Sequence, residues 1–268
     1  MSAVATSVRA PRARKTSSAE TPAKAPVRRP PAAKRKAAAA ATLTLSSRNY
    51  SSWSLRGWLL ARFAGLPFEE VMVSPDDADV RKELLLLAPS IRVPCLTHDG
   101  AKVWNTLAIA QYLDDVRPAA GLLPDDRLAR AHCRSICGEM NSGFANLRSA
   151  LPMNLKVRHD GFKVWAGAQA DIDRVTAIWR DCLQTYGGPY LFGKTPTMAD
   201  AMYAPVCSRF ATYDVKLDPA SAGYRDLMLE FPAMPRPLQV PSARTPAWSP
   251  ATRYASALPS ASPCTRIR

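Results

Sequence analysis

The stretch "NYSSWSLRGWLL" (residues 49–60) lies where a segment of strand character gives way to a helix. The preceding "TLTLSS" (42–47) has the composition of a strand. From 52 to 65 the apolar residues recur at helical spacing, and Gly65 supplies a helix stop. The stretch therefore predicts a strand-to-helix junction crowded with small hydroxyl groups.

The segments that follow continue an alternation of strands and helices. "PFEEVMV" (67–73) predicts a strand, and "DADVRKELLLLAP" (77–89) predicts a short helix ended by proline. "VPCLTHDGAKVW" (93–104) predicts two short strands around an Asp-Gly turn. "NTLAIAQYLDDV" (105–116) predicts an amphipathic helix. Its expected buried side is made up of Leu107, Ile109, Ala110 and Leu113. The order β-α-β-α-β-β-α is that of a small α/β unit, with helices packed on a mixed sheet.

The second half of the chain changes character after a proline-bearing linker at 118–124. Helical patterns cover 125–151, 160–187 and 197–212, with a weaker one at 218–230, and no strand of any length is predicted. Within the third of these, "TMAD" places a carboxylate three residues after a threonine, which is typical of a capping box at a helix start. We therefore expect an α/β unit followed by an all-helical unit.

The net charge of +14, from 36 basic and 22 acidic residues, belongs to the two ends of the chain. Residues 1–42 hold ten basic residues and one acidic residue, and residues 235–268 hold five basic residues and none that is acidic. Both segments are rich in proline and poor in apolar periodicity, so we interpret them as disordered tails. The basic "KRK" at 34–36 allows a nuclear or nucleic-acid patch, although a solvated tail is the simpler interpretation. An organelle transit peptide is a minor alternative.

The cysteine pattern favours reduced, buried thiols. The six cysteines form no CxxC pair, and no signal peptide precedes them, which predicts a cytoplasmic protein. Cys133 and Cys137 would share a helix face beside His132, but no further ligands are evident, so we expect core packing and no metal. No apolar run approaches the length of a membrane span, so we expect no membrane association.

Three short segments carry the expected chemistry. The first is the junction at 51–56, where the start of a helix favours the binding of an anion. A serine hydroxyl at this position can donate a hydrogen bond to a thiolate. Helix capping alone would also explain a serine there. In "RVPCL" (92–96) a cis peptide before Pro94 would turn the Val93 backbone outward, toward a peptide-like ligand. In "WNTLAIAQYL" (104–113) a helix start again offers free N–H groups, suited to a carboxylate.

Together, these motifs resemble the glutathione S-transferase family, in particular a bacterial, serine-type branch. The resemblance rests on "NYSSWSLRGWL", "RVPCL", "WNTLAIAQYL", "GEMNSGF", "PMN" and "TMADAMYAPV" and covers nearly all of the middle of the chain. It implies a thioredoxin-like, glutathione-binding domain at 43–117 and an all-helical, electrophile-binding domain at 125–234. It also implies a cytoplasmic homodimer that takes glutathione as co-substrate and uses no metal.

The resemblance also assigns the serines. The catalytic serine of such relatives lies five residues before the arginine of the first helix, which points to Ser51. Its hydroxyl would hydrogen-bond the glutathione sulfur, with Ser52 as the nearest rival, whereas Ser54 would serve packing or capping.

The remaining site residues follow from the same resemblance. Val93, next to a cis Pro94, would pair with the glutathione backbone, and Thr106 would hold the γ-glutamyl carboxylate. Arg92 is a candidate for the glycyl carboxylate. Asn105 would face the glutathione amino group, where relatives generally carry Glu or Asp, and the lost ion pair lowers the expected affinity by on the order of 1–2 kcal/mol. The electrophile pocket is expected at Met140, Asn141 and Phe144.

Two further departures from the family pattern shape the expectations. Relatives tend to carry His at the position of Asn141, and they continue past the equivalent of Met234 with another amphipathic helix. Residues 235–268 would then be translated from a shifted reading frame, or would replace a lost helix. The alternative function is a non-catalytic protein of the same fold, whose basic tails contact nucleic acid or protein partners.

Overall fold

The computed structural model describes residues 41–73, 92–232 and 234. All the described residues belong to one compact unit. The predicted helix at 77–89 and nearly all of the two predicted tails fall outside the described residues. No helix in the described ranges is long and apolar enough to cross a membrane.

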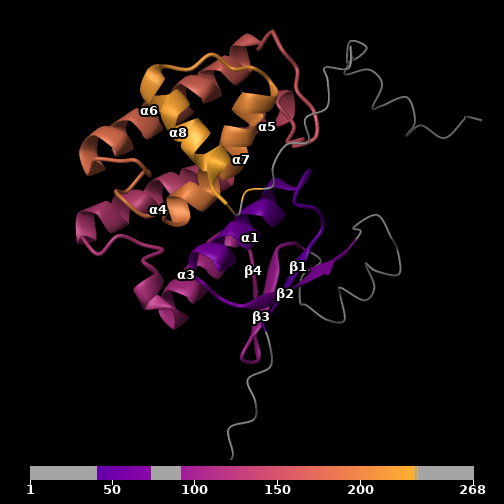
Figure 1. The fold of residues 1–268 in the computed structure, drawn as a ribbon, viewed down its shortest axis with the longest axis vertical. Coiled ribbons are helices and arrows are strands. Elements are labelled where there is room, and N and C mark those ends of the chain that lie inside the picture. Colours follow the sequence, from indigo (N-terminus) through magenta and orange to yellow (C-terminus); the bar gives the residue numbers. More distant parts are fainter. Residues whose placement is uncertain (1–40, 74–91, 233, 235–268) are drawn as a thin grey trace, which may run out of the picture. The chain divides into compact units, whose positions relative to one another are not determined.

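The first half contains a four-stranded mixed sheet with two described helices, as labelled in Figure 1. Its strands lie in the order β2-β1-β3-β4, with β1 and β2 parallel and the other two pairings antiparallel. The elements are β1 (Ala41–Leu45), α1 (Ser52–Phe63), β2 (Phe68–Met72), β3 (Cys95–His98), β4 (Ala101–Trp104) and α3 (Thr106–Val116). The folded part begins at least two residues before the predicted boundary at 43, because Ala41 and Thr42 already pair with β2.

The register of the sheet brings three chain segments to one end. Thr44, near the end of β1, pairs with Cys95 at the start of β3, and Cys95 in turn pairs with Trp104 at the end of β4. The residues after β1, before β3 and after β4 therefore leave or enter the sheet at the same edge. These are the three segments in which the sequence analysis placed chemistry.

The core of this half is built from β1 and α1. Leu43 and Leu45 point to the buried face of β1, in strict alternation with half-buried threonines. Helix α1 is buried on nearly every side, because it packs against α3 on one side and against α7 on another. Each fully buried leucine contributes about 1.5–3 kcal/mol relative to an exposed one. In α3, Ile109, Ala110 and Leu113 are buried as predicted, whereas Leu107 is half-buried and Thr106 is buried in addition.

The second half is helical, as predicted. It consists of the 3-10 turn η1 (Pro118–Ala120) followed by α4 (Arg127–Ser142), α5 (Ala145–Ala150), α6 (Ala166–Tyr186), α7 (Met198–Thr212) and α8 (Pro219–Glu230). Helix α7 is its centre: nearly all of its residues are buried, and it packs against α1, α4 and α8. The weakly predicted helix at 218–230 is present as α8.

Two predicted helices needed correction. The predicted helix at 125–151 is broken into α4 and α5, because Gly143 has an extended backbone and Phe144 has a positive φ of 60°. A side chain at Gly143 would lie 2.8 Å from the Glu139 carbonyl oxygen, so glycine permits the sharp exit from α4. The predicted helix at 160–187 begins only at Ala166.

The predicted capping box of α7 is confirmed. Thr197 and Asp200 bond each other's backbone N–H groups reciprocally, and Thr197 Oγ1 also donates to Asp200 Oδ2 at 2.9 Å. Asp200 Oδ1 additionally accepts from the Leu191 N–H at 3.1 Å and from the Tyr224 hydroxyl at 3.0 Å. This buried carboxylate therefore joins the start of α7 to the preceding loop and to α8.

Candidate functional site

Ser51 occupies the N-cap of α1. Its Oγ accepts a hydrogen bond from the Ser54 N–H at 3.2 Å, in the manner of a capping serine. A hydroxyl group has two acceptor lone pairs and one donor hydrogen, so this capping bond leaves the Ser51 O–H hydrogen available to a second partner. The side chain is half-buried, and the first turn of α1 contains no acidic residue. An anionic sulfur at this position would meet both a hydroxyl donor and the positive end of the helix.

The other two serines are less accessible. Ser54 is fully buried, and its Oγ accepts from the Ser46 N–H at 3.1 Å and lies 3.3 Å from the Ser46 Oγ. This confirms the packing role predicted for Ser54. Ser52, the predicted rival of Ser51, is only 8% exposed. Ser51 is thus the most open of the three hydroxyls.

The segment before β3 packs closely against α1. The Val93–Pro94 peptide bond is cis, as predicted. Pro94 is buried, Val93 is half-buried and Arg92 is exposed. A Cβ atom at Gly57 of α1 would lie 2.5 Å from both Cβ and Cγ of Pro94, so only glycine allows the helix and this segment to approach as they do.

The start of α3 holds an unusual backbone and an unpartnered hydroxyl. Asn105 is exposed, its φ of 76° and ψ of 134° lie in a region that residues other than glycine seldom adopt, and its Oδ1 accepts from the Leu107 N–H at 2.9 Å. Thr106 is buried, and its Oγ1 has no hydrogen-bond partner among the described residues. The first turn of α3 carries no acidic residue. A carboxylate at this helix start would satisfy both the free N–H groups and the Thr106 hydroxyl.

The three residues predicted for an electrophile pocket differ in exposure. Met140 is fully buried and Phe144 is 7% exposed, and both belong to the hydrophobic core. Asn141 is half-buried near the end of α4. Of the three residues, Asn141 is therefore the one that is partly exposed to solvent in the described structure.

The loop before α1 contacts the helical half of the chain. The Leu155 N–H donates to the Asn49 carbonyl at 3.3 Å, and the Lys156 ammonium lies 5.7 Å from the centre of the Tyr50 ring. The loop that follows α5 therefore lies beside the residues that lead into Ser51. A molecule bound next to Ser51 would have residues of both halves within reach.

A group of three arginines, two of them buried and one half-buried, lies close to this region and was not predicted from the sequence. Arg56 on α1 and Arg148 on α5 lie over the ring of Trp53, and Arg209 on α7 donates to the Arg148 carbonyl at 3.3 Å. Burial, together with the neighbouring Arg209 and Arg148 charges, lowers the pKa of Arg56 to about 9. Burial likewise lowers the pKa of Arg209 to about 10. The three positions are too far apart in the sequence for any spacing rule to connect them.

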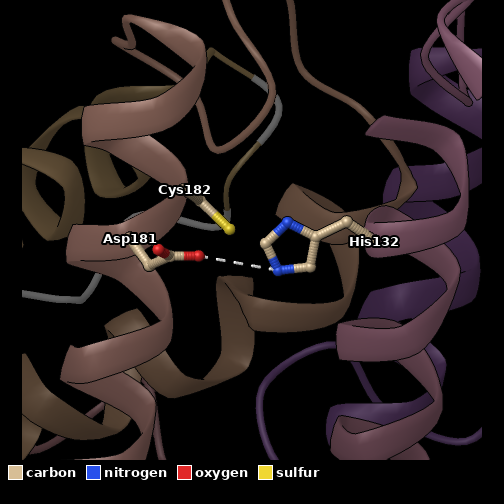
Figure 2. Close-up of side chains that lie close together, drawn as sticks. All are labelled: His132, Asp181 and Cys182. Atoms are coloured by element: carbon tan, nitrogen blue, oxygen red, sulfur yellow. Dashed lines mark ion pairs between the residues drawn. The ribbon is translucent and has the colours of Figure 1, made fainter. Parts of the chain in front are cut away.

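The side chains that a metal ion could use lie elsewhere, between α4 and α6. Figure 2 shows His132 facing Asp181 and Cys182, and one ligand atom from each lies within 4.8 Å of the others. The interpretation of Cys133 and Cys137 as core residues is supported, since both are fully buried, while His132 turns toward α6.

The histidine in this group already has protein partners. His132 Nδ1 lies 2.9 Å from the Tyr186 hydroxyl, and its Nε2 lies 3.8 Å from Asp181 Oδ2. Burial raises the pKa of Cys182 to about 12, so its thiol is neutral at pH 7. The three groups offer nitrogen, oxygen and sulfur atoms, and the contacts of His132 with Tyr186 and Asp181 form a polar link between α4 and α6.

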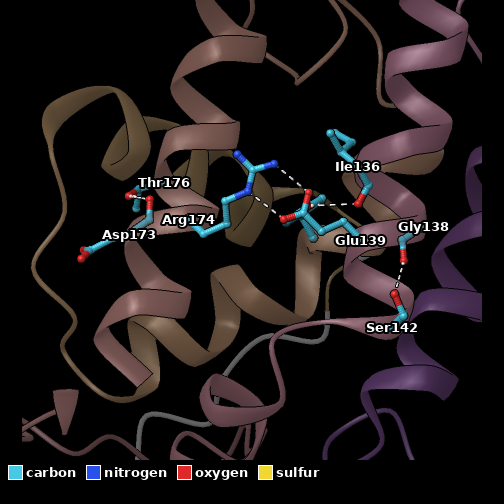
Figure 3. Close-up of polar contacts among 8 residues, drawn as sticks. Ile136, Gly138, Glu139, Ser142, Asp173, Arg174 and Thr176 are labelled. Atoms are coloured by element: carbon cyan, nitrogen blue, oxygen red, sulfur yellow. Dashed lines mark hydrogen bonds and ion pairs between the residues drawn. The ribbon is translucent and has the colours of Figure 1, made fainter. Parts of the chain in front are cut away.

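A second polar link joins the same two helices. Arg174 Nε and Nη2 donate to the two carboxylate oxygens of Glu139 at 2.7 and 2.8 Å, as Figure 3 shows. These hydrogen bonds from Arg174 hold the pKa of Glu139 below its usual value. The pair joins α4 to α6 through side chains that are partly exposed to solvent.

Comparison with known proteins matches both halves of the chain to one family. Residues 50–116 match the profile of the glutathione S-transferase N-terminal domain, and residues 156–234 match that of the glutathione S-transferase C-terminal domain. The rat maleylacetoacetate isomerase is 30% identical over 64% of this chain and 79% of its own length. A probable maleylacetoacetate isomerase from Caenorhabditis elegans is 27% identical over the same shares.

Solved structures agree on the fold. A glutathione transferase homologue from Burkholderia, crystallised with bound glutathione, is 25% identical, with a TM-score of 0.54 over 72% of this chain and 92% of its own. An unclassified glutathione S-transferase from Bombyx mori is 19% identical, with a TM-score of 0.59 over 72% and 90%. The predicted architecture, a thioredoxin-like unit followed by an all-helical unit, is confirmed. This chain therefore belongs to the glutathione S-transferase family of enzymes.

Proposed function

We propose that this protein binds glutathione at the end of the sheet where β1, β3 and β4 meet, and that it activates the glutathione thiol for attack on a hydrophobic electrophile. We place it in the serine-type branch of the family, with Ser51 as the catalytic residue. The observation that carries the proposal is the buried, unpartnered Thr106 hydroxyl at a helix start. Such a hydroxyl costs about 1–3 kcal/mol unless a ligand completes its hydrogen bonding.

Ser51 would act by electrostatic stabilisation. Its O–H hydrogen is free to donate to the sulfur, while its oxygen keeps the capping bond from Ser54. A hydrogen bond to the charged form of a thiol lowers its pKa, and the start of α1 acts in the same direction. A larger fraction of the bound glutathione is then thiolate at neutral pH, and the thiolate is the nucleophile that attacks the electrophile.

The other predicted residues would hold the tripeptide. The start of α3, with Thr106, suits the γ-glutamyl carboxylate, and Asn105 suits the amino group through a neutral hydrogen bond. The Val93 backbone would pair with the tripeptide backbone, and Arg92, which is exposed, would meet the glycyl carboxylate. Asn105 Oδ1 has two lone pairs, so it can accept from the ligand amino group while it also caps α3.

The electrophile would lie against the helical half, with Asn141 as the partly exposed residue of the expected pocket. By family analogy we infer a cytoplasmic homodimer that needs glutathione and no metal. The basic tails would also allow the protein to bind nucleic acid. A DNA-binding assay at several salt concentrations, comparing the full-length protein with a variant lacking residues 1–40, would test this.

A second candidate reaction is glutathione-dependent cis–trans isomerisation. It is favoured by the names of the rat and Caenorhabditis elegans relatives, both described as maleylacetoacetate isomerases. Both reactions begin with the same thiolate, so the same residues would serve both. Turnover of maleylacetoacetate with no net consumption of glutathione would identify the isomerase, whereas loss of free thiol would identify the transferase.

The test combines binding and turnover. Wild-type protein should be retained on immobilised glutathione and should conjugate chlorodinitrobenzene. Ser51→Ala should still bind but should lose about 10²-fold or more in kcat, because the donor acts mainly on the thiolate. Thr106→Val should instead weaken glutathione binding by about tenfold, because it removes a contact to the γ-glutamyl carboxylate.

Ser54→Ala is the matched control, because it removes a buried hydroxyl of the same helix that takes no part in the proposed chemistry. It should alter stability more than kcat. Equal turnover in wild type and Ser51→Ala would overturn the role of Ser51. Retention without any turnover would favour the non-catalytic alternative.

A further inference from the structure

The arginine group around Trp53 brings together three helices that are far apart in the sequence. Arg56 of α1 lies with its guanidinium carbon 4.6 Å from the centre of the Trp53 ring, and that of Arg148 of α5 lies at 5.5 Å. Arg209 of α7 donates to the carbonyl oxygens of Arg148 and Leu151. Two cationic side chains thus lie over one aromatic ring, and a third is bonded to the backbone of one of them.

The hydrogen-bonding capacity of this group is unfilled. Arg56 is 1% exposed, and its Nε donates to the Met202 carbonyl at 2.7 Å, but its Nη1 has no partner among the residues that the structure describes. Within the same residues, the Nη1 of Arg148 is likewise buried without a partner. Each Nη1 carries two N–H donors. Buried donors are nearly always satisfied, so these atoms point to a missing acceptor.

The charge of the group is also unbalanced. In the described part of the chain, the contacts of Arg56, Arg148 and Arg209 are backbone carbonyls and the Trp53 ring, and no carboxylate is among them. The lowered pKa values of Arg56 and Arg209, about 9 and about 10, still lie above neutral pH, so both remain charged. A buried charge without a counter-charge costs several kcal/mol. An anion would fill the empty donors and balance the charge at once.

The members of the group differ in their burial. Trp53 and Arg148 are both half-buried, whereas Arg56 and Arg209 are buried behind them. Trp53 lies in the first turn of α1, two residues after Ser51. A ligand would therefore have to reach the two buried Nη1 atoms past the half-buried Trp53 and Arg148 side chains.

We propose that Arg56, Arg148 and Arg209 form a binding site for an oxyanion, with the carboxylate of a small organic acid as its ligand. The planar guanidinium fork matches the two oxygens of a carboxylate, and a ring-stacked arginine is held in place before the ligand arrives. The site takes no glutathione, so it stands independently of the function proposed above. A purely structural cluster, in which the three arginines only bridge helices, is the alternative.

The first test measures binding of a probe acid to the full-length protein. Succinate should raise the unfolding temperature and give a saturable heat in calorimetric titration. Sodium chloride at the same ionic strength and dimethyl succinate should do neither, because one lacks the carboxylate and the other lacks the charge. A thermal shift with succinate no larger than that with sodium chloride would overturn the site.

The second test assigns the binding to the arginines. Arg148→Met should weaken the succinate Kd by about tenfold or more, which corresponds to the loss of one charge-assisted hydrogen bond. Arg134→Met is the matched control, because Arg134 is an exposed arginine of α4 and its loss changes the net charge equally. Arg148 is half-buried, so its variant should fold, whereas Arg56→Met removes a fully buried side chain. Equal affinities of the Arg148 and Arg134 variants would contradict the proposal.

Steady-state kinetics would then separate two sources of the carboxylate. Succinate that raises the KM for the acceptor substrate would place the acceptor's own carboxylate in the site. Succinate that binds without changing this KM would identify a separate, free organic acid as the ligand. Failure to detect any conjugation would count against the proposed transferase activity alone, because the calorimetric comparison of the two arginine variants does not depend on it.

Discussion

At the residue scale, a few small side chains determine which groups a ligand would meet at the end of the sheet where β1, β3 and β4 come together. Ser51 caps a helix and still has a hydrogen to donate, and the Thr106 hydroxyl is buried with no partner in the described structure. Gly57 lets Pro94 lie against α1. Each of these features is a matter of one or two atoms, and each lies beside the proposed glutathione site.

Gly57→Ala should destabilise the protein and weaken glutathione binding. The new methyl group would lie 2.5 Å from the rigid Pro94 ring, so α1 and the segment before β3 must separate. Overpacking of this kind costs about 1–3 kcal/mol, which outweighs the gain in helix propensity. Urea unfolding and glutathione titration would measure the two effects.

The control for that substitution is Gly223→Ala in α8. A Cβ atom there meets no other atom within 4 Å, so the variant should be unchanged or more stable by up to about 1 kcal/mol. A Gly57→Ala protein as stable as wild type, with unchanged affinity, would show that the close approach has no role.

At the element scale, side-chain pairs fix helices α4 and α6 to each other. The Glu139–Arg174 pair has bidentate geometry, and the His132–Asp181 pair lies a short distance along the same two helices. Both pairs are partly exposed to solvent, which limits their individual contributions.

Glu139→Gln should destabilise the protein slightly and in a pH-dependent way. The folded state lowers the pKa of Glu139, so the pair contributes stability above the unfolded pKa and loses it as the pH falls through the folded pKa. We expect a difference of about 0.5–1 kcal/mol at pH 7, discounted for exposure, that shrinks toward zero in acid. Urea unfolding of both proteins between pH 3 and about pH 7 would measure it. A difference that is constant across this range would contradict the assignment to the ionised carboxylate.

At the scale of the whole molecule, helix α7 connects the two halves. It packs against α1, α4 and α8, and the Met202 carbonyl accepts from Arg56 of the first half. Its start is held by Asp200, a fully buried carboxylate with four hydrogen bonds. Burial raises the pKa of Asp200, while those hydrogen bonds act against the rise.

Asp200→Asn should destabilise the whole folded unit. The amide keeps the volume but replaces one acceptor oxygen by two donors, which would face the donors of Thr197 or of Leu191 and Tyr224. We expect a loss of about 2–4 kcal/mol, seen as one cooperative shift in urea unfolding by circular dichroism and by tryptophan fluorescence. Asp226→Asn, at a mostly exposed position in α8, should change stability by less than about 0.5 kcal/mol. Similar values for both variants would exclude a special role for the buried carboxylate.

Much of the fold followed from local patterns. Strand-like composition and turns gave the strands of the sheet, helical spacing gave α1, α3 and α6 to α8, and a Thr-x-x-Asp sequence gave the capping box. The break at Gly143 and Phe144 was missed, because a helical pattern of apolar residues continues across it and only the packed structure requires the turn. The polar partners of His132 were missed for a related reason: they lie on another helix.

The sequence by itself determined the kinds of element, their order and the three polar segments at their ends, because each depends on interactions among neighbouring residues. Only the tertiary structure decided that these segments share one end of the sheet, since that depends on strand register between distant residues. The packing of the helices also brings Arg56 and Arg148 over the Trp53 ring and Arg209 to the Arg148 carbonyl. Their unfilled N–H groups arise from burial, and burial is a property of the packed chain, which no single segment of the sequence contains.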